Sequence, residues 1–495
     1  MSKIKSLLIL LRGKEIYIII SLLFLLPRTT SLKYDMSNSD AARWHRRSIG
    51  FLESLKSGDF KETYQSYHPG VTIMWIGAIS EEILFRYQLI RNMEPKTLEN
   101  ADFYPVIHLI TRLFVILSLL ALVTIQYELI GRLFSVKTAL IYVMLISIEP
   151  YYIGINRWFH LTSLEINLMF TSLLFVMYWS KCYDQRALNL SAVLLALALL
   201  TKISAVIVIP AIFLVLLLKF KEHRNVLILI SFPLLVILTF YLFFPAMWTD
   251  SFYVFSNIFR GITGSINGEI RKSDYSGITS FLYYPAVFLY KYSFVTVTLF
   301  LVSLWEIRKT KDFNILIVLA NILLSFLFLT ITSQKIDRYS IVFLPSIILT
   351  ISICFTNYLM KPGLPVFLSM MVFLIAVEKY HPVYSAYYSG VLGGTKTALE
   401  NGFYDNSGEY FANAAIYLNG KGRDITVYVP NNIESFSYYF KGNIKRDFDG
   451  DVDYVVYSMD TDRKRLNYFP GCEVVEEEFG PKDFSTVFVL KCPGE

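Results

Sequence analysis

The chain has 495 residues, of which 54% are hydrophobic and only 17% are charged, and its mean hydropathy is +0.47. A water-soluble protein of this length needs more charge to cover its surface, so the composition predicts an integral membrane protein. The 4 cysteines are too few for a disulfide-rich scaffold, and no Cys or His spacing indicates a structural zinc site.

Eleven stretches are apolar and long enough to predict membrane spans, since a spanning helix needs about 20 mostly apolar residues. They are residues 16–32, 104–130, 138–150, 164–179, 187–200, 203–218, 226–244, 281–305, 313–332, 340–358 and 364–377. No small-residue cleavage site follows the first stretch, so we interpret it as a retained span and not as a signal peptide.

Charge divides the chain near residue 381. Residues 381–495 hold 11 Lys and Arg against 17 Asp and Glu, a net charge of −6, which leaves 35 against 23, a net charge of +12, for residues 1–380. A basic membrane body suits anionic lipid head groups or a phosphorylated substrate. No basic cluster lies on an amphipathic soluble helix, so nucleic acid is not expected as a partner. We therefore predict a membrane domain over 1–380 and a soluble domain over 381–495.

The order of strand and helix signals in the second domain predicts a small α/β fold. A helix is expected over 408–419, and strands are expected over 425–429, 453–457, 473–477 and 486–490. The aromatic residues Phe436, Tyr438, Tyr439 and Phe440 are interpreted as core and not as a sugar-stacking surface. Cys472 and Cys492 are candidates for a disulfide, because this domain is predicted to lie in an oxidising compartment. The expected fold class is thus a polytopic α-helical membrane protein of about 11 spans with a small extracytoplasmic α/β domain.

Basic residues predict the orientation in the cell membrane. Lys and Arg precede the first span, and every second connection after it is also basic. The positive-inside rule makes this face cytoplasmic, which places the N-terminus inside and, after eleven spans, the C-terminal domain outside. Polar residues from many loops gather on the other face, which includes two long loops at 33–103 and 247–280. Ionisable groups near a membrane are costly and usually functional, so a site is expected there.

The first long outer loop contains a predicted amphipathic helix over 39–56 that lies on the membrane surface. Ser39 is expected to cap it and Gly58 to end it. Asp40 and Arg43 share one face of this helix. In one interpretation they merely pair with each other in the first turn. In the other, Asp40 is a general base just outside the bilayer, and Arg43 holds an anionic leaving group.

Motifs in order along the chain resemble the lipid-carrier-dependent glycosyltransferases of the GT-C superfamily, which includes the protein O-mannosyltransferases and the aminoarabinose transferases of lipid A. The string GDFKETYQSYHPGVTIMWIG at 58–77 looks like the signature of a prokaryotic branch. The other strings are NRWFHLTSL at 156–164, LALLTK at 197–202, FFPAMWTD at 243–250, KIDRYSIVFLP at 335–345 and HPVYSAYYSGVLGG at 381–394.

The resemblance implies transfer of a sugar from a polyprenyl-phosphate donor to a protein, lipid or glycan acceptor outside the cytoplasm. Such enzymes invert the anomeric carbon and use an acidic residue of the first outer loop as the base. Asp40 falls at that position, and Asp35 is a fallback. Many relatives have two adjacent acidic residues in the first loop, where this chain has Asp40 and Ala41, and many have an acidic residue where this chain has Thr162. Glu165 lies one helical turn after Thr162, so either Glu165 replaces the missing carboxylate or the second carboxylate is absent.

The candidate site follows from these positions. Asp40 and Glu165 are the predicted catalytic residues, and no metal or other cofactor is expected. The predicted ligands of the donor phosphate are Arg43, His68, Lys202 and Arg338, and weaker substrate contacts are Tyr64, Arg157, His160, Glu269 and Arg271. In the competing interpretation, Lys202 reaches to water at a span end and Arg338 pairs with Asp337. The glycines at 261, 264, 268 and 277 suggest a mobile gate in the second long loop.

Two other functions remain open. A transporter or flippase of lipid-linked sugars is expected to show internal repeats and charged residues near the bilayer midplane, whereas here the polar residues gather at one face. A catalytically impaired relative that acts as a scaffold is suggested by Ala41 and Thr162. The sequence does not identify the sugar, which is a hexose of the mannosyl type or a pentose.

Overall fold

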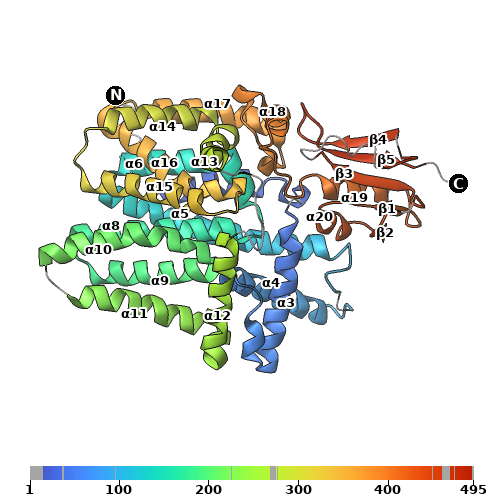
Figure 1. Cartoon of the computed structure of the whole chain (residues 1–495), viewed down its shortest axis with the longest axis horizontal. Helices are drawn as coiled ribbons and strands as arrows, with labels where there is room; N and C mark the ends of the chain where they lie inside the picture. The colour runs from blue at the N-terminus through green and yellow to red at the C-terminus, as the bar shows by residue number, and fades with distance from the viewer. Residues whose placement is uncertain are drawn as a thin grey trace.

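The computed structural model describes residues 15–35, 38–94, 96–223, 226–267, 275, 277–448, 450–459, 469–472 and 474–492. Most of its helices run side by side in one bundle (Figure 1). The helices α3 (Asp40–Ser57), α4 (Val71–Ile90) and α12 (Ala246–Asn267) run across this bundle near one end, and a sheet lies beyond that end. The crossing helices therefore lie where a membrane surface would meet the bundle.

Within the described residues, seven helical segments are long and apolar enough to cross a membrane, and up to ten spans result if each bent pair of helices counts as one. The seven are built on α2 (Glu15–Thr29), α5 (Tyr104–Leu133), α8 (Leu161–Cys182), α10 (Ile209–His223), α15 (Phe313–Ile331), α16 (Leu344–Ile353) and α17 (Gly363–Tyr380). A shorter apolar helix, α9 (Gln185–Thr201), covers the predicted span at 187–200. The chain is thus a multi-pass membrane protein, with fewer unbroken spans than the eleven predicted.

Three of the predicted spans fall on bent pairs of helices. The bends are 72° between α6 (Val136–Ile148) and α7 (Pro150–Asn156), 114° between α11 (Val226–Phe243) and α12, and 120° between α13 (Gly277–Lys291) and α14 (Phe294–Ile307). The prediction of one continuous helix over 281–305 is therefore wrong.

A buried carboxylate explains the break before α14. Glu149, at the bend between α6 and α7, accepts hydrogen bonds from the backbone N–H of Ser293 at 2.9 Å and from its hydroxyl at 2.8 Å. It also accepts a bond from the Thr296 hydroxyl at 2.7 Å. These groups provide for the unpaired donors of a helix N-terminus, so a helix can begin in the middle of an apolar stretch. The partner is 144 residues away in the chain, which hydropathy does not reveal.

The predicted helix over 39–56 is confirmed as α3, with one difference at its start. It ends at Gly58, whose φ of 79° is in the left-handed region that glycine favours. Ser39 makes no side-chain cap; instead the Asn38 side-chain oxygen accepts a bond from the Asp40 N–H at 3.0 Å. The apolar residues Trp44 and Phe51 are buried in the protein. They anchor α3, the helix that begins with Asp40, against the bundle.

The second long outer loop is largely helical. Gly261 and Gly264 lie inside α12, and Gly277 begins α13, whereas Gly268 lies outside the described residues. The structure does not test whether this segment moves, so the gate stays a prediction. α12 exposes Phe252 and Phe259, a pattern typical of a helix that lies at a membrane surface.

The C-terminal domain contains a five-stranded sheet of order β2-β1-β3-β5-β4. The strands are β1 (Thr426–Tyr428), β2 (Asn443–Lys445), β3 (Tyr454–Ser458), β4 (Val474–Phe479) and β5 (Val487–Lys491). β1 pairs in parallel with β2 and β3, and β5 pairs antiparallel with β3 and β4. Four of these strands are predicted, whereas β2, at the edge of the sheet, is not.

Two other predictions for this domain are confirmed. Phe436, Tyr438, Tyr439 and Phe440 are buried, in and beside the short helix α20 (Ile433–Ser437), and Cys472 and Cys492 form a disulfide. The helix predicted over 408–419 is α19 (Phe411–Asn419).

The domain docks on the end of the bundle where α3 begins. The ring of Tyr438 stacks on Tyr104, at the start of α5, with centroids 4.6 Å apart. The backbone N–H of Ser39 donates to the Ser407 carbonyl at 2.8 Å. The C-terminal domain thus touches the segment that carries Asp40.

Candidate active site

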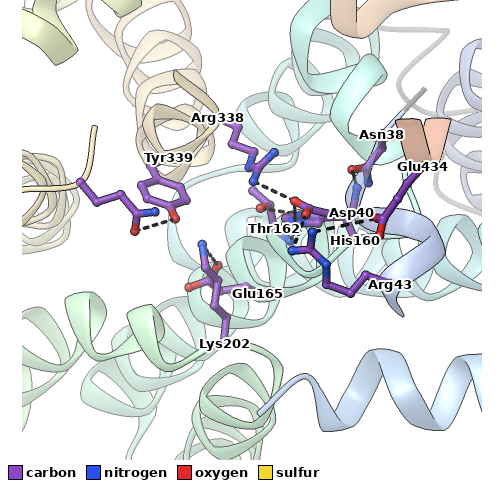
Figure 2. Close-up of polar contacts among 11 residues, drawn as sticks. Asn38, Asp40, Arg43, His160, Thr162, Glu165, Lys202, Arg338, Tyr339 and Glu434 are labelled. Carbon is purple, nitrogen blue, oxygen red and sulfur yellow. Dashed lines mark hydrogen bonds and ion pairs between the residues drawn. The ribbon is translucent and has the colours of Figure 1, made fainter. Parts of the chain in front are cut away.

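Asp40 is the centre of a charged cluster that draws on three segments of the chain. Its Oδ2 lies 2.9 Å from Nη2 of Arg338 and 3.6 Å from Nε2 of His160, and its Oδ1 lies 3.4 Å from Nη1 of Arg43 (Figure 2). Arg338 belongs to the 3-10 turn Asp337–Phe343, and His160 directly precedes α8. The fold therefore brings together three residues that the sequence predicts separately.

The charge of Asp40 is fixed by its neighbours. Burial by itself raises the pKa of this carboxyl, but the hydrogen bond with His160 and the positive charges of Arg338 and Arg43 outweigh burial and hold the pKa well below its usual range. Asp40 is therefore ionised at neutral pH, the form in which a carboxylate accepts a proton.

The ring of His160 is fixed in one tautomer. Its Nδ1 accepts a hydrogen bond from the backbone N–H of Thr162 at 3.2 Å and lies 3.0 Å from the Thr162 hydroxyl. A backbone N–H only donates, so Nδ1 of the neutral ring has no proton, and the proton is on Nε2, which faces Asp40. Burial lowers the pKa of His160 to about 4, so the ring is neutral at pH 7. Thr162 thus acts on Asp40 through His160, a contact that spacing in the sequence does not predict.

Arg338 is available to Asp40 because its neighbour has another partner. Asp337 lies 3.1 Å from Nζ of Lys291, and both side chains are buried. The competing interpretation, in which Arg338 pairs with Asp337, is therefore wrong.

Lys202 and Glu165 form a second, buried pair beside this cluster. Nζ of Lys202 lies 3.9 Å from Oε2 of Glu165 and 4.0 Å from the centre of the Tyr339 ring. The other oxygen of Glu165 accepts a hydrogen bond from the Ser204 hydroxyl. Lys202 is only 5% exposed, so it does not reach to water at a span end. Figure 2 shows this pair apart from the contacts of Asp40.

A cavity of about 110 Å³ joins the polar pair to an apolar wall. Its polar lining includes Lys202, Glu165, Thr162 and His68. Its apolar lining consists of Ile166, Met169, Ile203, Val206, Ile207, Ile262, Phe328, Leu329 and Val342. Thr162 and Glu165 line the same cavity, as their spacing of one helical turn predicts. The cavity suits a molecule with an anionic head and an apolar tail.

His68 lies in the wall of this cavity. Its ring packs on that of Tyr67, with centroids 4.2 Å apart, and burial, followed by the charge of Lys202, lowers the pKa of His68 well below its usual value. Within the part of the chain that the structure describes, its buried Nδ1 has no hydrogen-bond partner.

Two of the weaker candidates lie apart from this cavity. Arg157 is fully buried, pairs with Asp35 at 2.6 Å and donates to three carbonyls at the end of α2, so its contacts hold the bundle together. Asp35, the fallback base, is buried in this ion pair with Arg157. Tyr64 stacks on Phe244 with centroids 6.3 Å apart, near α12. The two other candidates, Glu269 and Arg271, lie outside the described residues.

Comparison with known proteins shows what part of the chain and its fold resemble. Residues 108–248 match the family model described as dolichyl-phosphate-mannose-protein mannosyltransferase. This match and the fold confirm the predicted resemblance to the GT-C superfamily of lipid-carrier-dependent glycosyltransferases. No curated protein matches the chain.

Two crystal structures of ArnT from Cupriavidus metallidurans have a similar fold. The structure bound to undecaprenyl phosphate matches with a TM-score of 0.56, and the apo structure matches with a TM-score of 0.53. Each is 13% identical to this chain, and each match covers 95% of this chain and 97% of the other. At this identity the likeness shows a common fold.

Proposed function

We propose that this protein transfers a sugar from a polyprenyl-phosphate donor to an acceptor at the extracytoplasmic face of the cell membrane. The observation that carries the proposal is the cavity with Lys202 at its polar end and an apolar wall along α8 and α15, next to the ionised Asp40. A transporter would need a path across the bundle, whereas this polar cluster lies where α3 and α8 begin.

The lipid phosphate binds at the polar end of the cavity in this proposal. Lys202 and Arg338 supply positive charge, Arg43 supplies more from the side of α3, and His68 supplies a ring nitrogen from the cavity wall. The isoprenoid chain follows the apolar wall. ArnT from Cupriavidus metallidurans, which has a similar fold, was solved with undecaprenyl phosphate bound. A cation at ~4 Å from the phosphate contributes roughly 4 kcal/mol before desolvation, at an effective dielectric constant of 20.

Asp40 is the general base of the proposed reaction. The acceptor hydroxyl loses its proton to the Asp40 carboxylate as its oxygen forms a bond to the anomeric carbon of the sugar. The bond from that carbon to the phosphate oxygen breaks, and its electron pair stays on the phosphate. Because the acceptor attacks from the side opposite the phosphate, the anomeric configuration inverts. Arg338 and Arg43 hold the pKa of Asp40 low in the free protein, and a donor phosphate that attracts these two cations makes the carboxylate a stronger base.

In this proposal, Glu165 takes the place of the carboxylate missing at Thr162, but it acts through Lys202 and not directly on the substrate. It lines the cavity and holds Lys202, so it sets the position of a phosphate ligand. His160, with its Nε2–H toward Asp40, orients the base and is close enough to touch the acceptor.

The remaining proposals concern the setting of the reaction. The N-terminus is cytoplasmic, the C-terminal domain is extracytoplasmic, and the reaction needs no metal. In the described residues no three His, Cys, Asp or Glu side chains are grouped so that they could hold a metal ion. Addition of a chelator to the transfer assay tests the last point, and loss of activity that a divalent metal restores would contradict it.

Purified protein in lipid vesicles, supplied with labelled polyprenyl-phosphate sugars and candidate acceptors, tests the function. We expect labelled product and free polyprenyl phosphate from the wild type. A folded protein that binds undecaprenyl phosphate but transfers no hexose or pentose from any donor would favour a scaffold. Movement of the intact donor across the vesicle membrane would favour a flippase.

A further inference from the structure

Glu434 belongs to the soluble domain but reaches the helix that carries Asp40. Its Oε1 lies 2.8 Å from Nη2 of Arg46, and its Oε2 lies 4.0 Å from Nη2 of Arg43. The same guanidinium of Arg43 lies 3.4 Å from Asp40. Figure 2 shows Arg43 between the two carboxylates, one from α3 and one from α20.

Other contacts of the soluble domain hold the same end of α3. Tyr438 is hydrogen-bonded to Arg46 through its hydroxyl, and the Ser407 carbonyl accepts from the Ser39 N–H at 2.8 Å. Gly408 packs so closely there that a Cβ would lie 3.1 Å from the Ser39 nitrogen. The first turn of α3 is thus held from outside the membrane domain, by residues more than 360 positions away in the chain.

The side chain of Arg43 needs such a holder. It is 51% exposed, and a free arginine side chain of this kind samples many rotamers. The side chain of Glu434 is 27% exposed, and within the described residues its buried Oε2 accepts no hydrogen bond. That oxygen is therefore free to attract Arg43, whose Nη2 lies 4.0 Å from it.

We propose that Glu434 is a positioning residue that fixes Arg43 beside Asp40, so that its guanidinium can also meet the phosphate of the lipid donor. The part that concerns the donor rests on the proposed function. Arg46 anchors Oε1 of Glu434, which leaves Oε2 for Arg43. The soluble domain thereby takes part in donor binding without touching the donor.

Donor kinetics test the proposal. The Glu434→Gln variant should raise KM for the donor about 5-fold, with a smaller change in kcat, since a partly exposed ion pair contributes at most about this much. Glu434→Asp, which keeps the charge, should restore part of the loss. The matched control is Lys441→Gln, which breaks a different pair of this domain, with Asp102 at 2.6 Å, and should leave KM unchanged.

A double variant shows whether Glu434 acts through Arg43. Arg43→Gln alone should raise KM at least as much, and Arg43→Gln combined with Glu434→Gln should raise it no further. If the two effects on KM multiply, Glu434 acts independently of Arg43 and the proposal is overturned.

Amide hydrogen exchange of residues 39–46 gives a measurement that needs no activity. Exchange should be faster in Glu434→Gln than in the wild type and in Lys441→Gln. Equal exchange in all three proteins would overturn the proposal whether or not the protein transfers sugar. If Glu434→Gln exchanges faster but the wild type transfers no sugar, the role of Glu434 is supported and the proposed function is refuted instead.

Discussion

Asp40 is surrounded by more positive charge than a general base needs. Two arginines and an N–H from His160 face one carboxylate, which stabilises its ionised form but also weakens it as a proton acceptor. The arrangement is consistent with a site completed by an anionic substrate, because a phosphate near the arginines takes over part of their charge.

Replacement of Asp40 with asparagine tests its role as the base. Asparagine keeps the size of the side chain and one hydrogen-bond acceptor but does not take up a proton. We expect kcat to fall by about 10² to 10⁴, the usual contribution of a general base. Binding of undecaprenyl phosphate should persist and serves as the control for folding. Unchanged transfer by Asp40→Asn would exclude Asp40 as the base.

The pH dependence of transfer follows from two lowered pKa values. Asp40, with its pKa held below the usual range, stays ionised as the pH falls, and His160, with a pKa of about 4, stays neutral. Neither group changes its charge between pH 8 and about 5.5, so kcat/KM should be flat across this range. A decline with a midpoint near the ordinary histidine value of about 6.5 would contradict the lowered pKa of His160.

Lys202 is the buried cation of the cavity, and its loss should weaken donor binding. In the Lys202→Gln variant we expect KM for the donor to rise by about 10-fold or more, because a buried charge contact contributes more than an exposed one. Lys361→Gln, at an exposed lysine outside the cavity, is the control. Equal KM values for the wild type and Lys202→Gln would place the phosphate elsewhere.

The residues of this site differ in how far the sequence predicts them. His160 and Arg338 lie in strings that resemble the GT-C family, Asp40 falls at the position of that family's acidic residue, and the structure brings the three side chains together. Arg157 lies in such a string too, but its contacts are with the end of α2. The parts played by Thr162 and Glu434 depend on hydrogen-bond direction and on domain docking, which no local pattern contains.

At the scale of helices, hydropathy predicts where apolar helices occur but not where they bend. The apolar run at 281–305 looks like one span, whereas the cap that Glu149 provides divides it into α13 and α14. The glycines of the second outer loop suggest flexibility, whereas Gly261 has a packing role in α12. The composition of a short run of residues predicts only its hydropathy and flexibility. Where a helix begins, ends or packs closely depends on contacts with residues that are distant in the chain.

The contact of α12 with the first outer loop positions one wall of the cavity. A Cβ on Gly261 would lie 2.4 Å from the side chain of Tyr67, and Tyr67 and the neighbouring Ile262 both line the cavity. Gly261→Ala must therefore push α12 away from the loop, with a loss of about 1–3 kcal/mol in stability, as for other overpacked sites.

We expect Gly261→Ala to lower the thermal midpoint and to raise KM for the donor several-fold. Gly363→Ala is the matched control, because a Cβ there meets no atom within 4 Å and it begins a helix outside the cavity. Similar midpoints and KM values for the two variants would show that the contact between Gly261 and Tyr67 does not shape the cavity.

For the whole molecule, the contacts at the two ends of α5 show which parts of the chain lie on opposite sides of the membrane. Its first residue, Tyr104, stacks on Tyr438 of the soluble domain, whereas the carbonyls of Arg132 and Leu133 at its other end accept hydrogen bonds from Lys181. A helix of 30 residues is about 45 Å long, enough to cross a bilayer. Cys182, next to Lys181, therefore lies on the side opposite the soluble domain.

The cysteines make this arrangement measurable in cells. Cys182 is exposed, Cys354 is buried, and Cys472 and Cys492 are joined in the disulfide. If the basic connections are cytoplasmic, a membrane-impermeant maleimide should not label the wild type in intact cells and should label Cys182 after permeabilisation. Cys182→Ser should abolish that label, and Lys396→Cys, at an exposed position beside the soluble domain, should be labelled in intact cells. Labelling of Cys182 in intact cells would reverse the orientation and place Asp40 on the cytoplasmic face.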